Sequence, residues 1–551
     1  MTRKATSDVW WKNAVVYCLD VETFLDSDED GCGDLPGLCE RVDYLTGLGI
    51  GCLWLMPFMP SCQRDDGYDI TDFYGVDPRL GTHGDLLDVV RAAREGGMRV
   101  IADLVMNHTS DQHPWFRDAR RGPESRFHEF YVWRDEKPEE KPGDVVFPDQ
   151  EDSNWAYDRK ARKWYMHRFY SHQPDLNVAN PEVRDEIAQV TGFWLEQGLS
   201  GFRVDAVPFL IEPGGAPEEG AADPHELLRD LRRFIGRRNG EAVLLGEVNL
   251  APEEQRKFFG DEDGDELQLL FSFTVNQAMY LSLAREDATP LARALEALPP
   301  IPEDCQWANF VRNHDELTLD KLSEEERQEV FDAFGPEKDL QLYGRGIRRR
   351  LPTMLGGDES RIRLVYSLAF SLPGTPVLFY GEEIGMAENL AIEGRYSVRA
   401  PMQWSAEPQA GFTTAEQAVR PVVGEGPFGY RELNVALQRR DPKSLLNWME
   451  RLIRRRRECP ELGWGEFTQL DSGDAAVFAH RSDWEGSTVV AAHNLAGREA
   501  RARLELGGEG VLVDLFHDDD HELEGGAVAL ELPPHGAHWF RLRRPGQRLP
   551  P

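Results

Sequence analysis

The sequence contains few cysteines and no Cys-X-X-Cys pair, although the chain has 551 residues. The seven cysteines are an odd number at scattered positions, which argues against a disulfide framework and against a zinc site built from cysteine pairs. We therefore expect reduced thiols and a cytoplasmic protein. The seven are Cys18, Cys32, Cys39, Cys52, Cys62, Cys305 and Cys459.

Long apolar runs are also missing. The stretch from Met1 to Asp8 is polar and lacks the apolar core of a signal peptide, and no run reaches the length of a membrane span. We expect no membrane partner.

Basic residues are outnumbered, with 62 Lys and Arg against 97 Asp and Glu and a net charge of -35. Because nucleic-acid binding needs a basic face, we expect no such partner, and we interpret Arg454–Arg457 as a solvated helix face.

What the sequence does contain is a repeated pattern of short apolar runs, each followed by a polar or glycine-rich break. Such runs are typical of strands buried in a parallel sheet. They lie at Ala14–Leu19, Gly51–Pro57, Arg99–Met106, Gly201–Val207, Ala242–Val248, Leu269–Phe273, Trp307–Val311 and Pro376–Tyr380. Helical patterns separate most of them, most clearly at Leu35–Leu48, Leu86–Glu95, Pro181–Gln197 and His225–Arg238. Eight alternations predict an α/β fold, a (β/α)8 TIM barrel. A doubly wound sheet would usually carry a glycine-rich phosphate fingerprint, which is absent.

Two segments depart from this alternation. About seventy residues rich in aromatic side chains lie between Asn107 and the helix that begins at Pro181, and an insertion of that length predicts a subdomain. After about Asn447, short strands such as Thr488–Asn494 predict a C-terminal antiparallel β-sandwich domain. The predicted domains are the first part of the barrel at 1–108, subdomain B at 109–178, the second part of the barrel at 179–446 and the β domain at 447–551.

Carboxylates stand at the ends of several predicted strands. In a TIM barrel, the carboxyl ends of the strands form the face that carries chemistry. Arg203 and Asp205 are two residues apart on one strand, so their side chains leave on the same face, and the guanidinium should keep Asp205 ionised. Glu247 follows the next strand, where partial burial and nearby carboxylates should raise its pKa. Asp315 follows the seventh strand.

Two carboxylates that flank one sugar bond are sufficient for retaining glycoside chemistry. Asp205 suits the nucleophile, Glu247 the general acid/base, and Asp315 a third anion that stabilises an oxocarbenium-like centre. Two histidines could donate hydrogen bonds to sugar hydroxyls, although a histidine alone is more often a structural group. One tyrosine could stack on a sugar ring, and alone it is just as readily a packing residue. The three are His108, His314 and Tyr68.

An acidic loop near the N-terminus predicts a cation site. Asp26, Asp28, Asp30 and Asp34 stand at positions 1, 3, 5 and 9 of an EF-hand-like loop with Gly31 at position 6. Position 12 is a glycine, so the bidentate Glu is missing. We expect one structural Ca²⁺ or Mg²⁺, with a solvated acidic turn as the alternative.

With these residues assembled, the chain resembles glycoside hydrolase family 13, the α-amylase superfamily. Four stretches resemble the signature regions of that family in order: Asp103–His108, Gly201–Val207, Gly246–Asn249 and Asn313–Asp315. The resemblance implies the same roles for the three carboxylates. It also implies a first sugar subsite formed by Asp65, Tyr68, His108, Arg203 and His314.

A later stretch, Val398–Trp404, resembles the oligosaccharide-glucosidase branch, whose arginine, here Arg399, pairs with Asp65 and closes the pocket. A closed pocket favours small α-glucosides as substrates. Arg64–Ile70 and His167–Asn177 resemble the branch that isomerises maltose to trehalose. This resemblance implies that the first metal uses Asp26, Asp28, Asp30, Asp34 and the carbonyl of Cys32. It implies a second Ca²⁺ on Asn107, Asp175, Glu212 and the carbonyls of Phe209 and Leu210.

The resemblance therefore implies an enzyme that isomerises maltose to trehalose by double displacement. An α-glucosidase or an α-glucosyltransferase would use the same catalytic residues with water or another acceptor. Loops on the expected acceptor side differ from that branch, since Leu250-Ala251 replace its usual Gln-Trp and Gly214–His225 replace a longer stretch. A non-catalytic sugar-binding member is a remote alternative, because all three carboxylates are present. The sequence leaves the oligomeric state, including a homodimer, open.

Overall fold

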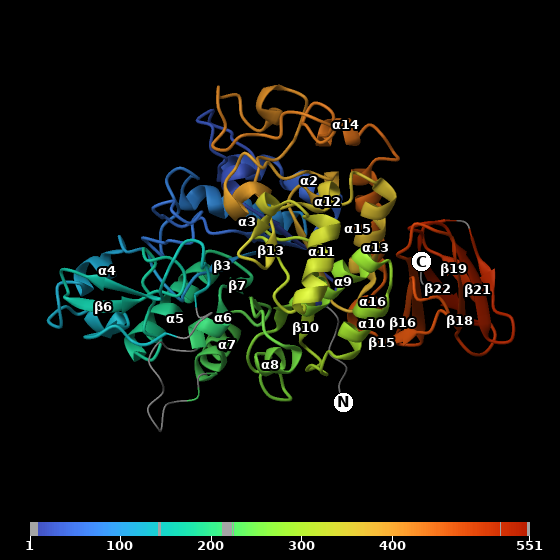
Figure 1. The fold of residues 1–551 in the computed structure, drawn as a ribbon, viewed down its shortest axis with the longest axis horizontal. Helices are drawn as coiled ribbons and strands as arrows, with labels where there is room; N and C mark the ends of the chain where they lie inside the picture. Colours follow the sequence, from blue (N-terminus) through green and yellow to red (C-terminus); the bar gives the residue numbers. More distant parts are fainter. Residues whose placement is uncertain (1–8, 141–144, 212–222, 224, 518, 548–551) are drawn as a thin grey trace.

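A closed barrel of eight parallel strands forms the centre of the molecule (Figure 1). The computed structural model describes residues 9–140, 145–211, 223, 225–517 and 519–547. The strands close in the order β1-β14-β10-β9-β8-β7-β3-β2, and every neighbouring pair is parallel. Six predicted runs contain one of them, and the other two overlap strands that begin one residue earlier, so the predicted TIM barrel is confirmed. They are β1 (Val16–Leu19), β2 (Cys52–Leu55), β3 (Arg99–Leu104), β7 (Gly201–Val204), β8 (Val243–Gly246), β9 (Leu269–Phe271), β10 (Gln306–Phe310) and β14 (Thr375–Phe379).

The barrel strands are buried on both faces, which explains their continuous apolar runs. The register between β7 and β8 pairs Gly201 with Val243 and Val204 with Gly246. The residues that follow these strands, Asp205 and Glu247, therefore leave the barrel at the same level.

The helices around the barrel begin at local sequence signals. Thr82 and Asp85 form a capping box at the start of α3 (His83–Glu95), and Asn180 caps α5 (Pro181–Glu196). The helix predicted at Leu35–Leu48 is instead two helices, α1 (Leu35–Glu40) and α2 (Val42–Leu48), which meet at Arg41. The helix predicted at His225–Arg238 is α7 (Glu226–Arg238).

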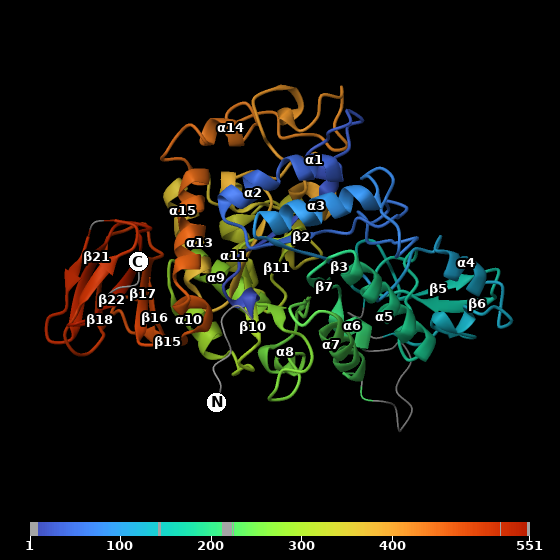
Figure 2. The same cartoon turned by 180° about the vertical axis from the view of Figure 1, so that it is seen from behind.

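The segment between β3 and α5 forms a small sheet in the order β4-β6-β5 beside the barrel (Figure 1, teal). Its strands are antiparallel: β4 (Trp133–Arg134), β5 (Trp155–Asp158) and β6 (Lys163–Met166). The aromatic residues of the insertion pack against one another, as when the ring of Trp133 stacks on Phe116 with centroids 5.6 Å apart. In both views this sheet and the C-terminal domain lie at opposite ends of the molecule (Figures 1 and 2).

The C-terminal domain is built from two antiparallel sheets, in agreement with the predicted sandwich. One sheet has the order β15-β16-β17-β22-β19-β20 and the other pairs β18 with β21. Apolar side chains from both sheets form its core, including Val490 and Phe540 from the first and Leu504 and Leu530 from the second. The strands are β15 (Glu466–Leu470), β16 (Val477–Trp484), β17 (Ser487–Asn494), β18 (Ala500–Glu505), β19 (Val511–Asp514), β20 (His521–Glu522), β21 (Ala527–Leu532) and β22 (Ala537–Arg543).

Helix α15 (Leu445–Glu458) crosses the boundary predicted at residue 447 and packs on α2 and on α13 (Glu359–Ser371). Its basic run is only partly solvated. Arg454, Arg455 and Arg457 are exposed, but Arg456 is fully buried, so the interpretation of the whole run as a solvated face is wrong for this residue. Its guanidinium donates to the carbonyls of Gly374, at 2.7 Å, and Lys12, at 3.4 Å, which explains why a charged side chain lies inside.

All seven cysteines are unpaired in the structure. No helix in the part of the chain that the structure describes combines the length and the apolar character needed to cross a membrane.

Arg456→Met should destabilise the protein by about 2–4 kcal/mol, because it keeps the apolar stem but leaves two buried carbonyls without their donor. Arg455→Met on the same helix removes only a surface pair with Glu458 and should change stability by less than about 0.5 kcal/mol. The midpoint of urea unfolding, followed by circular dichroism, measures both. Equal shifts in the two variants would contradict this role for Arg456.

Candidate active site

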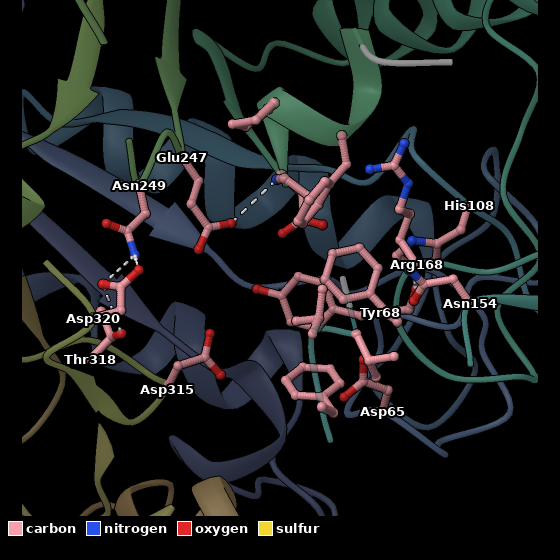
Figure 3. A pocket seen from close by; sticks show the side chains of 18 of the residues that line it. Asp65, Tyr68, His108, Asn154, Arg168, Glu247, Asn249, Asp315, Thr318 and Asp320 are labelled. Carbon is pink, nitrogen blue, oxygen red and sulfur yellow. Dashed lines mark hydrogen bonds between the residues drawn. The ribbon is translucent and has the colours of Figure 1, made fainter. Parts of the chain in front are cut away.

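A cavity of about 750 Å³ opens where the barrel strands end (Figure 3). Part of its wall comes from the inserted subdomain, including Phe147 and Trp155. In Figure 3, Glu247 and Asp315 extend from different sides toward the same space. Most of the predicted site residues line this cavity: Asp65, Tyr68, His108, Asp205, Glu247, His314 and Asp315. Arg203 and Arg399 are not among the lining residues, but they pair with carboxylates that are.

The buried guanidinium of Arg203 holds two of the predicted catalytic carboxylates. Its Nη1 donates to Asp205 Oδ1 at 2.5 Å, and its Nη2 donates to Glu247 Oε2 at 2.7 Å. Nη1 also contacts Asp103 Oδ1 at 2.5 Å. Burial raises the pKa of Asp205 to about 6, although Arg203 opposes this shift. Asp205 is therefore mainly ionised at neutral pH, as the sequence led us to expect. Its pKa nevertheless lies closer to neutral pH than that of an exposed aspartic acid.

Glu247 begins the loop after β8. Its Oε2 accepts a second hydrogen bond from the backbone N–H of Ala206, at 3.3 Å. Burial raises the pKa of Glu247 against the opposing charge of Arg203, and the charges of Asp205 and Asp315 raise it further. Ala206 has a left-handed backbone with φ of 48°, a conformation that costs energy for a residue other than glycine and is common at functional sites. This turn directs the Ala206 N–H toward Glu247.

Asp315 has the opposite electrostatic surroundings. Its Oδ1 accepts from Arg399 Nη2 at 2.8 Å and from Arg395 Nη1 at 2.9 Å, and its Oδ2 lies 3.2 Å from His314 Nε2. Burial alone would raise the pKa of Asp315, but Arg395, His314 and Arg399 together lower it well below the usual range. Asp315 is therefore a fixed anion in the cavity wall.

The predicted pair between Arg399 and Asp65 is wrong. Arg399 pairs with Asp66 and Asp315, while Asp65 pairs with Arg395. Asp65 also accepts from the hydroxyl of Tyr396 at 2.9 Å. The physical reason is the backbone at Asp66, whose positive φ of 52° turns the chain so that adjacent carboxylates meet different arginines.

Three residues that the sequence reasoning did not assign to the site belong to this network. Arg395 bridges Asp65 and Asp315, and the only signal for it was its position four residues before Arg399. Arg420 pairs with Asp66 from a distant loop, and nothing in the sequence indicated it. Asp103 contacts Arg203 and also accepts from Trp54 Nε1 at 2.7 Å.

Two carboxylates that follow β14 do not join the cavity lining. The carboxylate of Glu383 accepts from the hydroxyls of Tyr17, at 2.8 Å, and Tyr44, at 2.6 Å, inside the protein. Glu382 accepts from Tyr366 at 3.0 Å. Not every strand-end carboxylate is therefore part of the cavity.

The inserted subdomain reaches across the cavity to later segments of the chain. Arg345 Nη2 donates to the carbonyl of Val146 at 2.7 Å. The ring of Phe147 lies 5.3 Å from that of Tyr343, and the guanidinium of Arg395 lies 5.0 Å from the Phe147 ring centroid. These contacts join the inserted subdomain to later loops at the wall of the cavity.

The acidic loop has a donor set that fits a hard cation. Ligand oxygens of Asp26, Asp28 and Asp34 lie within 4.8 Å of one another, and Gly31 has the positive φ of 92° that the loop turn requires. Asp30 is not part of this group, and its Oδ1 accepts from the backbone N–H of Cys32 at 2.7 Å. A cation there would be held chiefly by three carboxylates.

The described residues of the second predicted metal site fit less well. Asn107 Nδ2 donates to Asp175 Oδ1 at 3.2 Å, so these two residues are adjacent. The guanidinium of Arg168, however, lies near both Asp175 and the ring of Phe209, so a positive charge already stands beside this group. Glu212 lies outside the described residues. A second Ca²⁺ stays a prediction.

Comparisons with known proteins agree with this geometry. Residues 20–332 and 347–465 match a family model described as the catalytic domain of alpha amylase. A trehalose synthase/amylase of Mycobacterium tuberculosis is 40% identical over 98% of this chain and 92% of its own length. A trehalose synthase of Thermus thermophilus is 42% identical over 97% of this chain and 56% of its own length.

Solved structures share the whole architecture. A trehalulose synthase variant in complex with Tris superimposes with a TM-score of 0.78 at 27% identity. The superposition covers 97% of this chain and all of the other.

Proposed function

This chain belongs to the α-amylase family, and on that premise we propose that it isomerises maltose to trehalose through a covalent glucosyl intermediate. The relatives named trehalose synthase support this choice of reaction. The observation that carries the proposal is the convergence of Asp205, Glu247 and Asp315 on one cavity, with one guanidinium bonded to the first two. Small α-glucosides are the proposed substrates.

In the first half-reaction, Asp205 attacks the anomeric carbon of the non-reducing glucose of maltose. The bond from that carbon to the glycosidic oxygen breaks, and Glu247 gives its proton to the oxygen as glucose leaves. The product is a β-glucosyl ester on Asp205. Asp315, ionised beside two arginines, stabilises the positive charge that develops on the sugar.

In the second half-reaction, Glu247 is a carboxylate and acts as the base. It takes the proton of the anomeric hydroxyl of the released glucose after that sugar has rotated. The hydroxyl oxygen then attacks the anomeric carbon of the glucosyl ester, and the bond from that carbon to the Asp205 oxygen breaks. Asp205 leaves as a carboxylate, and the new bond is the α,α-1,1 linkage of trehalose. Water that attacks in place of glucose gives hydrolysis, so the balance of products depends on how long the cavity retains glucose.

Contacts between the inserted subdomain and later loops support retention of the released glucose. Phe147 and Val146 of the inserted subdomain contact Tyr343, Arg345 and Arg395 at the cavity wall. These contacts restrict the routes by which glucose leaves or water enters.

Hydrolysis or transfer to another acceptor is the second candidate function. Leu250 lines the cavity where the resembled branch usually has a glutamine, so one hydrogen-bonding group on the acceptor side is replaced by an apolar one.

The unpaired state of all seven cysteines supports a cytoplasmic location as part of the same proposal.

Incubation with maltose, followed by chromatography of the products, tests the reaction. We expect trehalose as the main product and a loss of at least about 10³-fold in turnover for Asp205→Asn and Glu247→Gln, because each removes a group that acts on the reacting bond. Glu254→Gln, which changes an exposed carboxyl on α8 (Pro252–Lys257), is the control and should be near wild type.

The products separate the candidates. Mainly glucose would favour a glucosidase, and new linkages to an added sugar would favour a transferase. Near-wild-type turnover of Asp205→Asn would overturn the catalytic assignment altogether.

The value of kcat/KM for maltose should fall as the pH is lowered through about 6. The nucleophile must be ionised, and burial raises the pKa of Asp205 to about 6, so lowering the pH through this value protonates it. On the alkaline side, activity should fall as Glu247 loses the proton that it donates. Activity that is unchanged down to pH 4 would contradict the nucleophile assignment.

We further propose that Asp26, Asp28 and Asp34 hold a structural Ca²⁺, with Mg²⁺ as the alternative ion. The loop packs against the segment that carries Arg420, since Thr413 Oγ1 donates to Asp26 and the backbone N–H of Val419 donates to the carbonyl of Gly31 at 2.7 Å. The ion would supply charge balance for three neighbouring carboxylates and hold this loop in place.

Removal of Ca²⁺ by EDTA should lower the melting temperature of the wild type, and restoring Ca²⁺ at about 100 times its Kd should return about 2.7 kcal/mol of stability. Asp28→Asn should lose most of this gain because it removes one ligand charge. Asp43→Asn, an exposed carboxyl on α2, is the matched control. If Ca²⁺ stabilises Asp28→Asn as much as wild type, the loop is a solvated turn.

A further inference from the structure

The C-terminal domain carries a group of metal-ligating side chains that has no part in the proposed sugar chemistry. Asp514 ends β19, His517 follows three residues later, and His538 lies on β22, the strand that pairs with β19. One potential ligand atom from each of the three lies within 4.8 Å of the others. We call these three residues the His517–His538 cluster.

The spacing of the ligand atoms fits a single ion. His538 Nδ1 lies 2.8 Å from Asp514 Oδ2, and His517 Nδ1 lies 3.4 Å from Asp514 Oδ1. Ligands about 2.1 Å from one metal ion are about 3.0 Å apart at octahedral angles and about 3.4 Å apart at tetrahedral angles. The two distances end on different oxygens of Asp514, and one ligand atom of each residue lies within 4.8 Å of the others, so side-chain adjustment brings all three within reach of one ion.

Surrounding groups hold two of the three side chains in place. The side chain of Asp514 is fully buried, and its Oδ1 accepts the backbone N–H groups of Phe516 and His517, each at 2.7 Å. The ring of His538 stacks on Phe540 with an interplanar angle of 5°. Such supporting contacts orient metal ligands and tune their affinity. The side chain of His517 is 61% exposed, which leaves an approach for the ion from solvent.

The donor set indicates the class of ion. Two imidazoles and one carboxylate suit Zn²⁺ and similar transition metals, whereas Ca²⁺ and Mg²⁺ prefer oxygen ligands alone. Asp520, whose Oδ1 accepts from the backbone N–H of Asp514 at 3.2 Å, adds negative charge next to the cluster. The net charge of -35 also favours cations near the surface.

We propose that Asp514, His517 and His538 bind one Zn²⁺-class transition-metal ion. The ion joins the end of β19 to β22 and stabilises this edge of the C-terminal domain. The alternative use of the same side chains is a hydrogen bond between His538 and Asp514 with no metal, and the experiment separates the two.

Calorimetric titration of the full chain with Zn²⁺, after treatment with a chelator and in excess Ca²⁺ to saturate the acidic N-terminal loop, tests the proposal. Wild type should bind one Zn²⁺, and His517→Ala and His538→Ala should each weaken this binding by at least about tenfold. The exposed position of His517 makes its replacement safe for folding. His521→Ala is the matched control, because His521 is a nearby histidine on β20 that pairs with Asp519 and does not belong to the cluster.

Zn²⁺ should also raise the melting temperature of wild type and of His521→Ala, but not that of His517→Ala. The proposal is overturned if wild type binds no Zn²⁺, if His517→Ala and His538→Ala bind it like wild type, or if His521→Ala weakens binding as much as they do.

Discussion

The buried guanidinium of Arg203 is the interaction on which the rest of the site depends. It contacts carboxylates that follow or end three neighbouring barrel strands: Asp103 on β3, Asp205 after β7 and Glu247 after β8. Carboxylates without a counter-ion at these buried positions would be costly. The cation allows the barrel to bring these acids together, and the same bonds fix the two proposed catalytic groups relative to each other. The stability of the barrel mouth and its chemistry thus depend on one side chain.

The three cavity carboxylates differ in proton affinity because their neighbours differ. Asp315 faces two arginines, which lower its pKa far enough to keep it anionic. Asp205 and Glu247 share one arginine, and burial raises the pKa of both. Groups of one chemical type can therefore serve as a fixed anion, a nucleophile and a proton donor at the same pH. Arg395 and Arg399, from the segment after β14, produce this division by pairing with Asp315 rather than with Glu247.

The barrel and the carboxylates of its cavity could be predicted because buried parallel strands are continuous apolar runs, so the polar residues that follow most of these runs mark the functional face. Contacts set by loop geometry could not. The left-handed backbone at Asp66 decides which carboxylate meets Arg399, and no periodic pattern encodes it. Burial of Arg456 depends on carbonyls from distant segments. The His517–His538 cluster appears only when β19 and β22 pair, since Asp514 and His538 are 24 residues apart.

The central claim is that Asp205 becomes covalently bonded to glucose during turnover. The most direct measurement is mass spectrometry of peptides from Glu247→Gln after brief reaction with an α-glucosyl fluoride, whose leaving group needs no proton donor. The account predicts one added glucosyl residue on the peptide of Glu247→Gln that contains Asp205. It predicts no added residue in the double variant that also carries Asp205→Asn. A label on another residue, or release of product with no label at all, would contradict it.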